Sequence, residues 1–207
     1  MFKDSGEDIY DLNSGFLGIY VDRIRVLIVG GGRVGYLKAK GLLNQGIIPD
    51  VMSRDFIDDF NRLNINLIKD EATIDLLSKY HFIVVAVKEY KDLKNMLDKL
   101  NKLYIICSDK EEGNSFMPAI SKNKGFTMAI TSNGSPKGAV FLRDKLLKIA
   151  FRYEDFLYDM RKIREEVKKR EDKEKILDFI YSDDFYFFYL KKKHKLVLNM
   201  FFGGFYD

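Results

Sequence analysis

The sequence predicts an α/β fold whose front half is a parallel sheet and whose last third is helical. A short apolar run, Val26–Val29, leads directly into three glycines and a helix-compatible segment. Strand and helix signals then alternate with short connections, an order typical of parallel sheets with right-handed crossovers. From Leu142 to Val167, apolar residues recur at spacings of four and three, as in an amphipathic helix.

The first strand ends in a glycine turn of the kind that binds dinucleotides. Gly30, Gly32 and Gly35 satisfy the pattern G-x-G-x-x-G. The first glycine permits a tight turn, the second lets the backbone approach a pyrophosphate, and the third lets the helix lie close to the strand. The helix expected at residues 34–45 offers unpaired N–H groups to the anion. We therefore predict a Rossmann-type dinucleotide site, with a purely structural glycine turn as the alternative.

The other elements of the sheet follow in order. We expect strands at residues 47–52, 65–68, 82–87 and 103–107, and helices at residues 73–78 and 90–101. Ligands of such sheets bind beyond the carboxyl ends of the strands. Residues 53–55, 87–89 and 108–109 each follow one of these strands, so we expect them to meet the glycine turn at one crevice.

The segment after the sheet has a different character. Residues 126–131 predict another strand, and residues 132–138 a turn that leads into a helix. We interpret the apolar stripe from Leu142 to Val167 as core or as a subunit interface, because such a face must be covered. The aromatic residues at 185–190 and 197–202 also indicate packing.

Composition and charge exclude several classes of protein. The chain has 207 residues, 46% of them hydrophobic, and one cysteine, which favours a globular protein in a reducing compartment. No apolar run approaches the roughly 20 residues that span a bilayer, so we expect a cytoplasmic protein with no membrane partner. The net charge is +4, and residues from Lys137 onward contain 17 Lys and Arg against 13 Asp and Glu. These charges are interleaved, which indicates solvated helix surfaces and not a nucleic-acid site.

The sequence offers little support for a metal site or for a nucleophilic cysteine. His81 and His194 are far apart and have no further ligands at suitable spacing, so we predict no metal site. Cys107 is expected to pack at a strand end and not to act as a nucleophile.

Several motifs together resemble one known family. The runs V-L-I-V-G-G-G-x-V-G, S-F-M-P-A-I, K-G-F-T-M-A-I-T-S-N-G-S-P and L-R-D-K-L follow one another from about Phe16 to about Arg170. In this order they resemble the siroheme synthase family, in particular its precorrin-2 dehydrogenase module.

The resemblance implies an oxidoreductase that uses NAD to convert the tetrapyrrole precorrin-2 to sirohydrochlorin in siroheme biosynthesis. Some relatives also insert iron. It further implies a homodimer whose chain comprises an N-terminal extension (residues 1–15), an NAD-binding Rossmann domain (16–112), a dimerisation and active-site segment (113–150) and a C-terminal helical region (151–207).

The resemblance also implies roles for individual residues. The cofactor is expected to contact Gly30, Gly32, Arg33, Val34, Gly35, Arg54, Asp55 and Val87. Asp55 favours NAD because it can bind the ribose hydroxyls, whereas Arg54 could instead bind the 2′-phosphate of NADP. The carboxylates of precorrin-2 are expected to bind Lys122, Lys124, Ser135 and Arg143.

The resemblance also implies that Asp109 is the catalytic residue, because the family's key aspartate follows the corresponding strand; a carboxylate there could accept the proton released in the oxidation. Two alternatives stay open at this position: Asp109 can be a turn cap, or Ser108 can occupy the family's catalytic place, because the loop before Met117 is one residue shorter than in relatives. For the chain as a whole, the alternatives are a non-catalytic NAD-sensing regulatory protein and an inactive relative.

Overall fold

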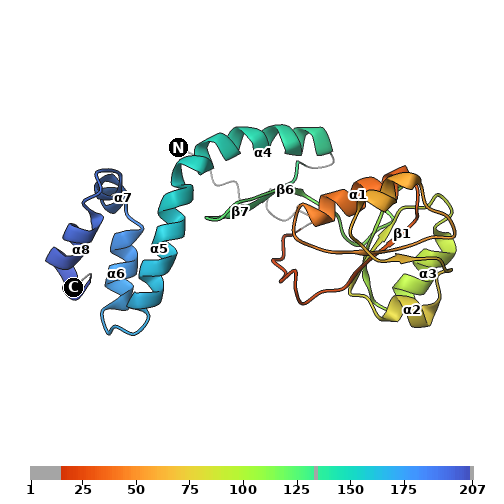
Figure 1. The fold of residues 1–207 in the computed structure, drawn as a ribbon, viewed down its shortest axis with the longest axis horizontal. Coiled ribbons are helices and arrows are strands. Elements are labelled where there is room, and N and C mark those ends of the chain that lie inside the picture. Colours follow the sequence, from red (N-terminus) through yellow and green to blue (C-terminus); the bar gives the residue numbers. More distant parts are fainter. Residues whose placement is uncertain (1–14, 133–134, 206–207) are drawn as a thin grey trace, which may run out of the picture. The chain divides into compact units, whose positions relative to one another are not determined.

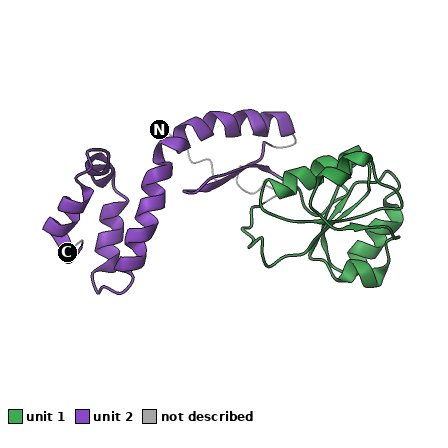
Figure 2. Ribbon diagram, in the orientation of Figure 1, with its two compact units in different colours: residues 1–117 green, residues 118–207 purple. Residues whose placement is uncertain are grey.

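A computed structural model describes residues 15–132 and 135–205 (Figure 1). The chain divides into two compact units, Met1–Met117 and Pro118–Asp207 (Figure 2). The predicted N-terminal extension, apart from Gly15, lies outside the described residues, as do Asn133 and Gly134 of the predicted turn.

Unit 1 contains a parallel sheet of five strands. The strands are β1 (Val26–Val29), β2 (Asp50–Met52), β3 (Leu67–Ile68), β4 (Phe82–Val85) and β5 (Leu103–Ile106). They lie in the order β3-β2-β1-β4-β5, and all of their pairings are parallel. The order reverses between β1 and β4, which is the topological switch point where ligands of such sheets bind. The predicted α/β fold of Rossmann type is confirmed.

Helices cover both faces of this sheet. They are α1 (Arg33–Leu43), the 3-10 helix η1 (Asp58–Arg62), α2 (Ile74–Ser78) and α3 (Lys91–Lys99). The predicted helices agree with α1, α2 and α3 to within two residues at each end. The helix η1 was not predicted, because it is held by a tertiary contact: the buried ring of Phe60 packs edge-on against Tyr36 of α1.

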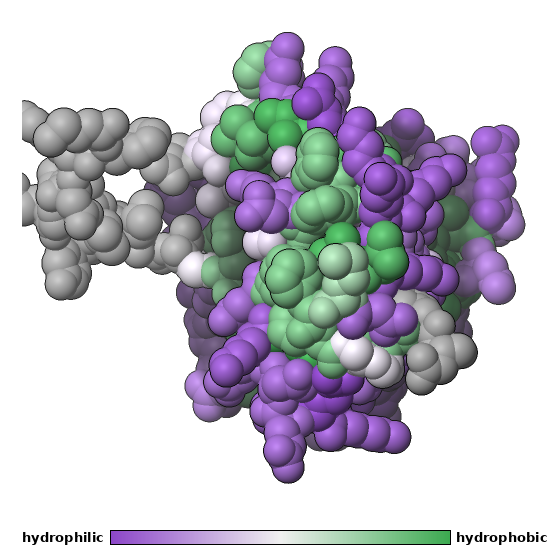
Figure 3. Space-filling view, turned by 90° about the vertical axis from the view of Figure 1, so that its left-hand side faces the viewer, coloured by the Kyte–Doolittle hydropathy of each residue, from purple (hydrophilic) through white to green (hydrophobic). Residues whose placement is uncertain are grey.

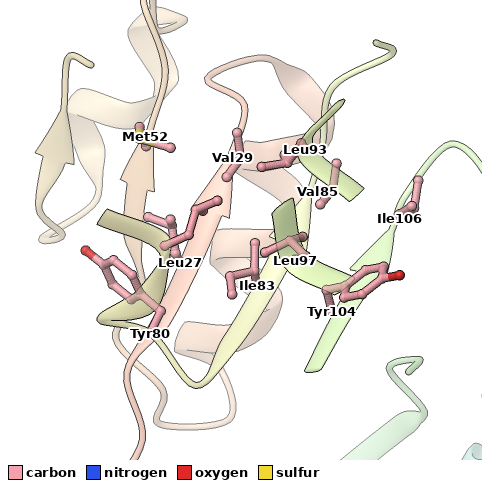
Figure 4. Close-up of a cluster of buried hydrophobic side chains, with 11 residues drawn as sticks. Leu27, Val29, Met52, Tyr80, Ile83, Val85, Leu93, Leu97, Tyr104 and Ile106 are labelled. Carbon is pink, nitrogen blue, oxygen red and sulfur yellow. The ribbon is translucent and has the colours of Figure 1, made fainter. Parts of the chain in front are cut away.

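The central strands β1 and β4 are almost entirely buried on both faces, as expected for a parallel sheet between helices. On one face the core combines the strands with α2 and α3, through Leu27, Val29, Ile83, Val85, Leu77, Leu93 and Leu97 (Figure 4). On the other it combines them with α1 and η1, through Val26, Ile28, Val84, Tyr36, Ala39, Leu42 and Phe60. Because β1 is fixed from both sides, the turn that follows it is held in a defined position.

Unit 2 begins with a β-hairpin covered by a helix. Strands β6 (Ala119–Lys122) and β7 (Thr127–Ile130) are antiparallel, and α4 (Pro136–Ala150) packs on both. The predicted strand corresponds to β7. The partner strand β6 was not predicted, because residues that mix alanine, serine and lysine show no strand periodicity; it forms by pairing with β7.

A helical bundle completes unit 2. It contains the 3-10 helix η2 (Phe151–Tyr153), α5 (Glu154–Val167), α6 (Lys173–Ile180), α7 (Asp183–Leu190) and α8 (His194–Phe202). Its core is made of Phe156, Met160, Ile163, Val167, Ile176, Ile180, Phe185, Leu198 and Phe205.

Unit 2 buries only part of the apolar residues that the sequence predicts to be covered. The stripe from Leu142 to Val167 is buried where it lies on α5, but on α4 Leu142, Leu146 and Ile149 are exposed. The aromatic segments near the end of the chain were expected to pack, and Phe185 does. Other large apolar side chains of α7 and α8 face solvent, because each short helix buries only one face.

Candidate dinucleotide-binding and active site

The glycine turn after β1 is sterically constrained. Gly30 has φ of +129°, a conformation that side chains disfavour, and a Cβ there would lie 2.6 Å from the carbonyl oxygen of Ala86. A Cβ on Gly35 would overlap the carbonyl oxygen of Gly30. These two glycines therefore allow β1, the loop after β4 and the start of α1 to approach one another closely.

Gly32 differs from them, since a Cβ there would meet no atom within 4 Å. It precedes the first turn of α1, which contains no acidic residue and has no side-chain cap hydrogen bond. The N–H groups and the positive end of the helix dipole are thus presented to an open space. These features fit the pyrophosphate of a dinucleotide.

Gly31 has a role that the sequence analysis missed. A Cβ there would overlap the carbonyl oxygen of Asp55 and lie 2.9 Å from the Cβ of Ser53. The N–H of Ile57 also donates to the carbonyl oxygen of Gly31, at 3.0 Å. The loop after β2 therefore lies directly against the glycine turn. The available signal was that Gly31, between the first two glycines of the pattern, is itself a glycine.

The charged residues expected near the cofactor are largely exposed. Arg54 donates to Glu71 with 2.7 Å between Nη2 and Oε1. Arg33 lies 3.8 Å from Asp59, and Asp55 is exposed beside Arg54. Glu71 follows β3, and no local sequence pattern predicted its contact with Arg54.

The two apolar side chains expected near the cofactor differ in exposure. Val34 is exposed in the first turn of α1. Val87 is half-buried, because its side chain packs against the core that the strands share with α2 and α3. The backbone around Val87 follows β4, next to the glycine turn across the switch point.

Asp109 is half-buried after β5, and both of its oxygens accept hydrogen bonds. Oδ1 accepts from the N–H of Glu111 at 3.2 Å, and Oδ2 accepts from the hydroxyl of Tyr90 at 3.3 Å. Burial and the neighbouring Asp109 carboxylate raise the pKa of Tyr90, which keeps that hydroxyl a donor. The bond to Glu111 is the turn-cap interaction. Ser108, in contrast, is exposed.

Cys107 precedes this loop and is half-buried. Burial raises the pKa of its thiol, an effect that Lys38 opposes. A thiol held in its protonated form is a poor nucleophile. This supports the packing role that was expected for Cys107.

The residues expected to bind substrate all belong to unit 2, and three of them have partners there. Lys124 is 2.6 Å from Asp155. Arg143 pairs with Asp144 at 2.7 Å. The Oγ of Ser135 accepts from the N–H of Gly138 as the N-cap of α4. The fourth residue, Lys122, is exposed at the end of β6.

Each histidine has a local contact within its own unit. His81 Nδ1 accepts from the N–H of Arg25, and the ring of His194 lies 4.9 Å from that of Tyr189. Within residues 15–132 and 135–205, no group of three or more His, Cys, Asp or Glu side chains is arranged to hold a metal ion.

Comparison with protein families supports a nicotinamide cofactor. Residues 17–119 match a family described as "Putative NAD(P)-binding". The matched segment contains the glycine turn and every strand of the parallel sheet.

Individual relatives point to one enzyme class. A protein of Methanocaldococcus jannaschii named "Putative precorrin-2 dehydrogenase" is 30% identical over 188 residues, which cover 81% of this chain and 90% of that protein. Siroheme synthase 2 of Pectobacterium atrosepticum is 33% identical over 59% of this chain, but the match covers only 28% of that longer protein. A solved structure named "SirC, precorrin-2 dehydrogenase" is 20% identical, with a TM-score of 0.60 over 82% of this chain and 90% of that one. It shares the fold. These relatives do not favour the regulatory sensor.

Proposed function

This chain belongs to the precorrin-2 dehydrogenase family and is an oxidoreductase of siroheme biosynthesis, and from this we propose that it oxidises precorrin-2 to sirohydrochlorin with NAD. The observation that carries the proposal is the open, uncapped N-terminus of α1 behind Gly32. It lies at the switch point of the same sheet whose strand β5 leads to Asp109.

The residues of unit 1 fit the cofactor as follows. The N–H groups at the start of α1 bind the pyrophosphate, and the close approach allowed by Gly32 brings the backbone to it. Asp55 accepts hydrogen bonds from the adenosine ribose. NAD is favoured over NADP because the ion pair with Glu71 offsets the charge of Arg54, which would otherwise attract a 2′-phosphate.

Bound NAD supplies the chemistry of hydride acceptance. Removing two hydrogens from precorrin-2 also releases a proton, which needs a base. Asp109 is the proposed base, and the Tyr90 hydroxyl with the N–H of Glu111 holds its carboxylate in place. The exposed ammonium of Lys122 is proposed to bind a substrate carboxylate, together with Lys124, Ser135 and Arg143.

Iron insertion into the product is a secondary proposal that uses the same carboxylate. A base near the macrocycle can accept protons from pyrrole nitrogens as the metal enters. It requires no resident metal site in the protein.

The test is anaerobic incubation of the protein with precorrin-2 and NAD or NADP, with NADH or NADPH absorbance and the tetrapyrrole spectrum recorded together. We expect turnover by the wild type, a preference for NAD, and a loss of turnover by at least about a hundredfold in Asp109→Asn. The affinity of this variant for NAD, measured by calorimetry, should be unchanged. Glu112→Gln, in the same loop, is the matched control and should retain activity.

Other results would contradict the proposal. If the wild type binds NAD but shows no turnover of precorrin-2, the proposed dehydrogenation is rejected, although the NAD site is retained. Full activity in Asp109→Asn, together with a loss of activity in Ser108→Ala, would indicate that Ser108 and not Asp109 occupies the family's catalytic position.

A further inference from the structure

The surface formed by α7 and α8 carries large apolar side chains in contact with solvent. On α7, Phe187 and Leu190 are 55% and 59% exposed. On α8, Leu196, Met200 and Phe201 are 59%, 71% and 67% exposed. Figure 3 views this end of unit 2 and shows apolar side chains gathered at the centre of the face, bordered by hydrophilic residues. A contiguous apolar patch of this kind indicates a binding surface.

The two helices are firmly attached behind this patch. Phe185 of α7 and Leu198 of α8 are fully buried in the core of unit 2. The guanidinium of Arg170 donates to the carbonyl oxygens of Phe202 and Gly203, at 2.7 and 2.9 Å, which fixes the end of α8. The exposed side chains therefore belong to a well-packed element, and their exposure does not arise from poor packing.

Positive charge lies next to the apolar side chains. Lysines 191–193 are exposed in the turn between α7 and α8. The ammonium of Lys191 is 5.7 Å from the centre of the Phe187 ring, so charge and apolar surface are adjacent. Residues 185–205 contain four lysines and no aspartate or glutamate. We call this combination of lysines 191–193 with the five exposed apolar residues the lysine–apolar surface.

We propose that the lysine–apolar surface binds the headgroup region of an anionic lipid bilayer. Protein interfaces are enriched in arginine and depleted in lysine, yet residues 171–207 contain no arginine. Clustered lysines beside exposed Phe, Leu and Met are typical of elements that lie in the membrane interface. The proposal departs from the sequence-based expectation that no membrane is a partner.

Binding at the interface agrees with the dimensions of the helices. Among the residues that the structure describes, no helix is long and apolar enough to cross a membrane. The proposed contact is therefore peripheral, with the apolar side chains inserted shallowly and the lysines at the lipid phosphates.

Two other occupants fit less well. Symmetrical packing of this surface against a second copy would bring two runs of lysines together, and like charges repel. A small ligand would need a pocket, but a cavity of about 300 Å³ in unit 2 is lined by residues such as Phe126, Tyr153 and Tyr186, and by none of the five exposed apolar residues.

The test is co-sedimentation of the full-length protein with vesicles of phosphatidylcholine alone or mixed with phosphatidylglycerol. We expect binding to the anionic vesicles only, weakened by high salt. The variants Lys191→Gln/Lys192→Gln/Lys193→Gln and Met200→Ser/Phe201→Ser should each weaken it by about tenfold or more. Ile48→Ser, at a residue of unit 1 that is 72% exposed, is the control and should bind as the wild type does.

Equal binding to both kinds of vesicle, or none to either, would overturn the proposal. So would a result in which Met200→Ser/Phe201→Ser changes the sedimentation coefficient of the protein without lipid, since the surface would then contact another copy of the chain. Circular dichroism of each variant checks that it is folded, so a loss of binding can be assigned to the surface. None of these readouts depends on dehydrogenase activity.

Discussion

The four glycines around the turn after β1 are required for different physical reasons. Gly30 adopts a positive φ, and Gly31 and Gly35 leave no room for a Cβ beside neighbouring backbone. Gly32 has open space in the direction of its absent side chain. Gly30, Gly31 and Gly35 are therefore required for folding, whereas Gly32 is required for the approach of a ligand to the turn.

This difference predicts that one added methyl group lowers stability at Gly35 but lowers the affinity for NAD at Gly32. Gly35→Ala should destabilise unit 1 by about 1–3 kcal/mol, because the backbone must shift in a packed region. Gly32→Ala should change the free energy of unfolding by less than about 1 kcal/mol, but weaken NAD binding by about tenfold or more, since the methyl occupies the path of the pyrophosphate. Urea unfolding and calorimetric titration with NAD separate the two effects. Similar loss of stability in both variants would contradict this account.

At the scale of elements, Arg170 connects three parts of unit 2. It follows α5, pairs with Asp172 before α6 at 2.9 Å, and donates to the carbonyl oxygens at the end of α8. Its guanidinium also lies 4.9 Å from the centre of the Phe205 ring. One side chain thus holds the last helix against the first of the bundle.

The ion pair makes the stability of unit 2 depend on pH. Hydrogen bonds from Arg170 hold the pKa of Asp172 below its ordinary value of 3.8. Because the folded-state pKa is the lower one, the pair stabilises the fold above the unfolded-state pKa, and this contribution disappears as the pH falls through the folded-state pKa.

We expect Arg170→Gln to lower the Tm at neutral pH, and the difference from the wild type to narrow below about pH 4. It should not vanish, because the bonds to the carbonyl oxygens do not titrate. Thermal unfolding followed across this pH range measures the effect, with the exposed neighbour variant Lys169→Gln as control. A difference in Tm that stays constant with pH would show that the ion pair contributes nothing.

At the scale of the whole molecule, α4 carries a row of exposed apolar side chains along most of its length. Phe141 and Ile149 are 64% and 56% exposed, and Leu142 and Leu146 also reach solvent. The apolar stripe was interpreted as core or as a subunit interface. Within the described residues its α5 part is core, which leaves the interface interpretation for α4.

The homodimer implied by the family resemblance is therefore proposed to pack through α4. Leu142→Ser/Ile149→Ser should shift the protein from dimer to monomer at micromolar concentrations, because it removes apolar area from the contact. Sedimentation velocity measures this. Met200→Ser, at an exposed residue of α8, is the control and should leave the dimer intact. A monomeric wild type, or a dimer unaffected by the α4 variant, would reject the proposal.

The sequence determined the order of the elements in unit 1 and the glycine turn. Both depend on local physics: an apolar run such as Val26–Val29 must be buried, and only glycine fits the backbone conformation at Gly30. The ends of α1, α2 and α3 were predicted closely for the same reason. Chain order also predicted which residues follow each strand, and so it predicted that Asp109 lies at the carboxyl edge of the sheet.

Only the tertiary structure decided which of these residues meet and which faces stay uncovered. The contacts of Gly31 with the loop after β2, of Arg54 with Glu71, and of Tyr90 with Asp109 join segments that are separated in sequence. The strand β6 exists because β7 pairs with it. Likewise, the apolar residues of α4 and α8 face solvent because the core is already filled by neighbouring helices, and periodicity alone does not distinguish a buried face from an exposed one.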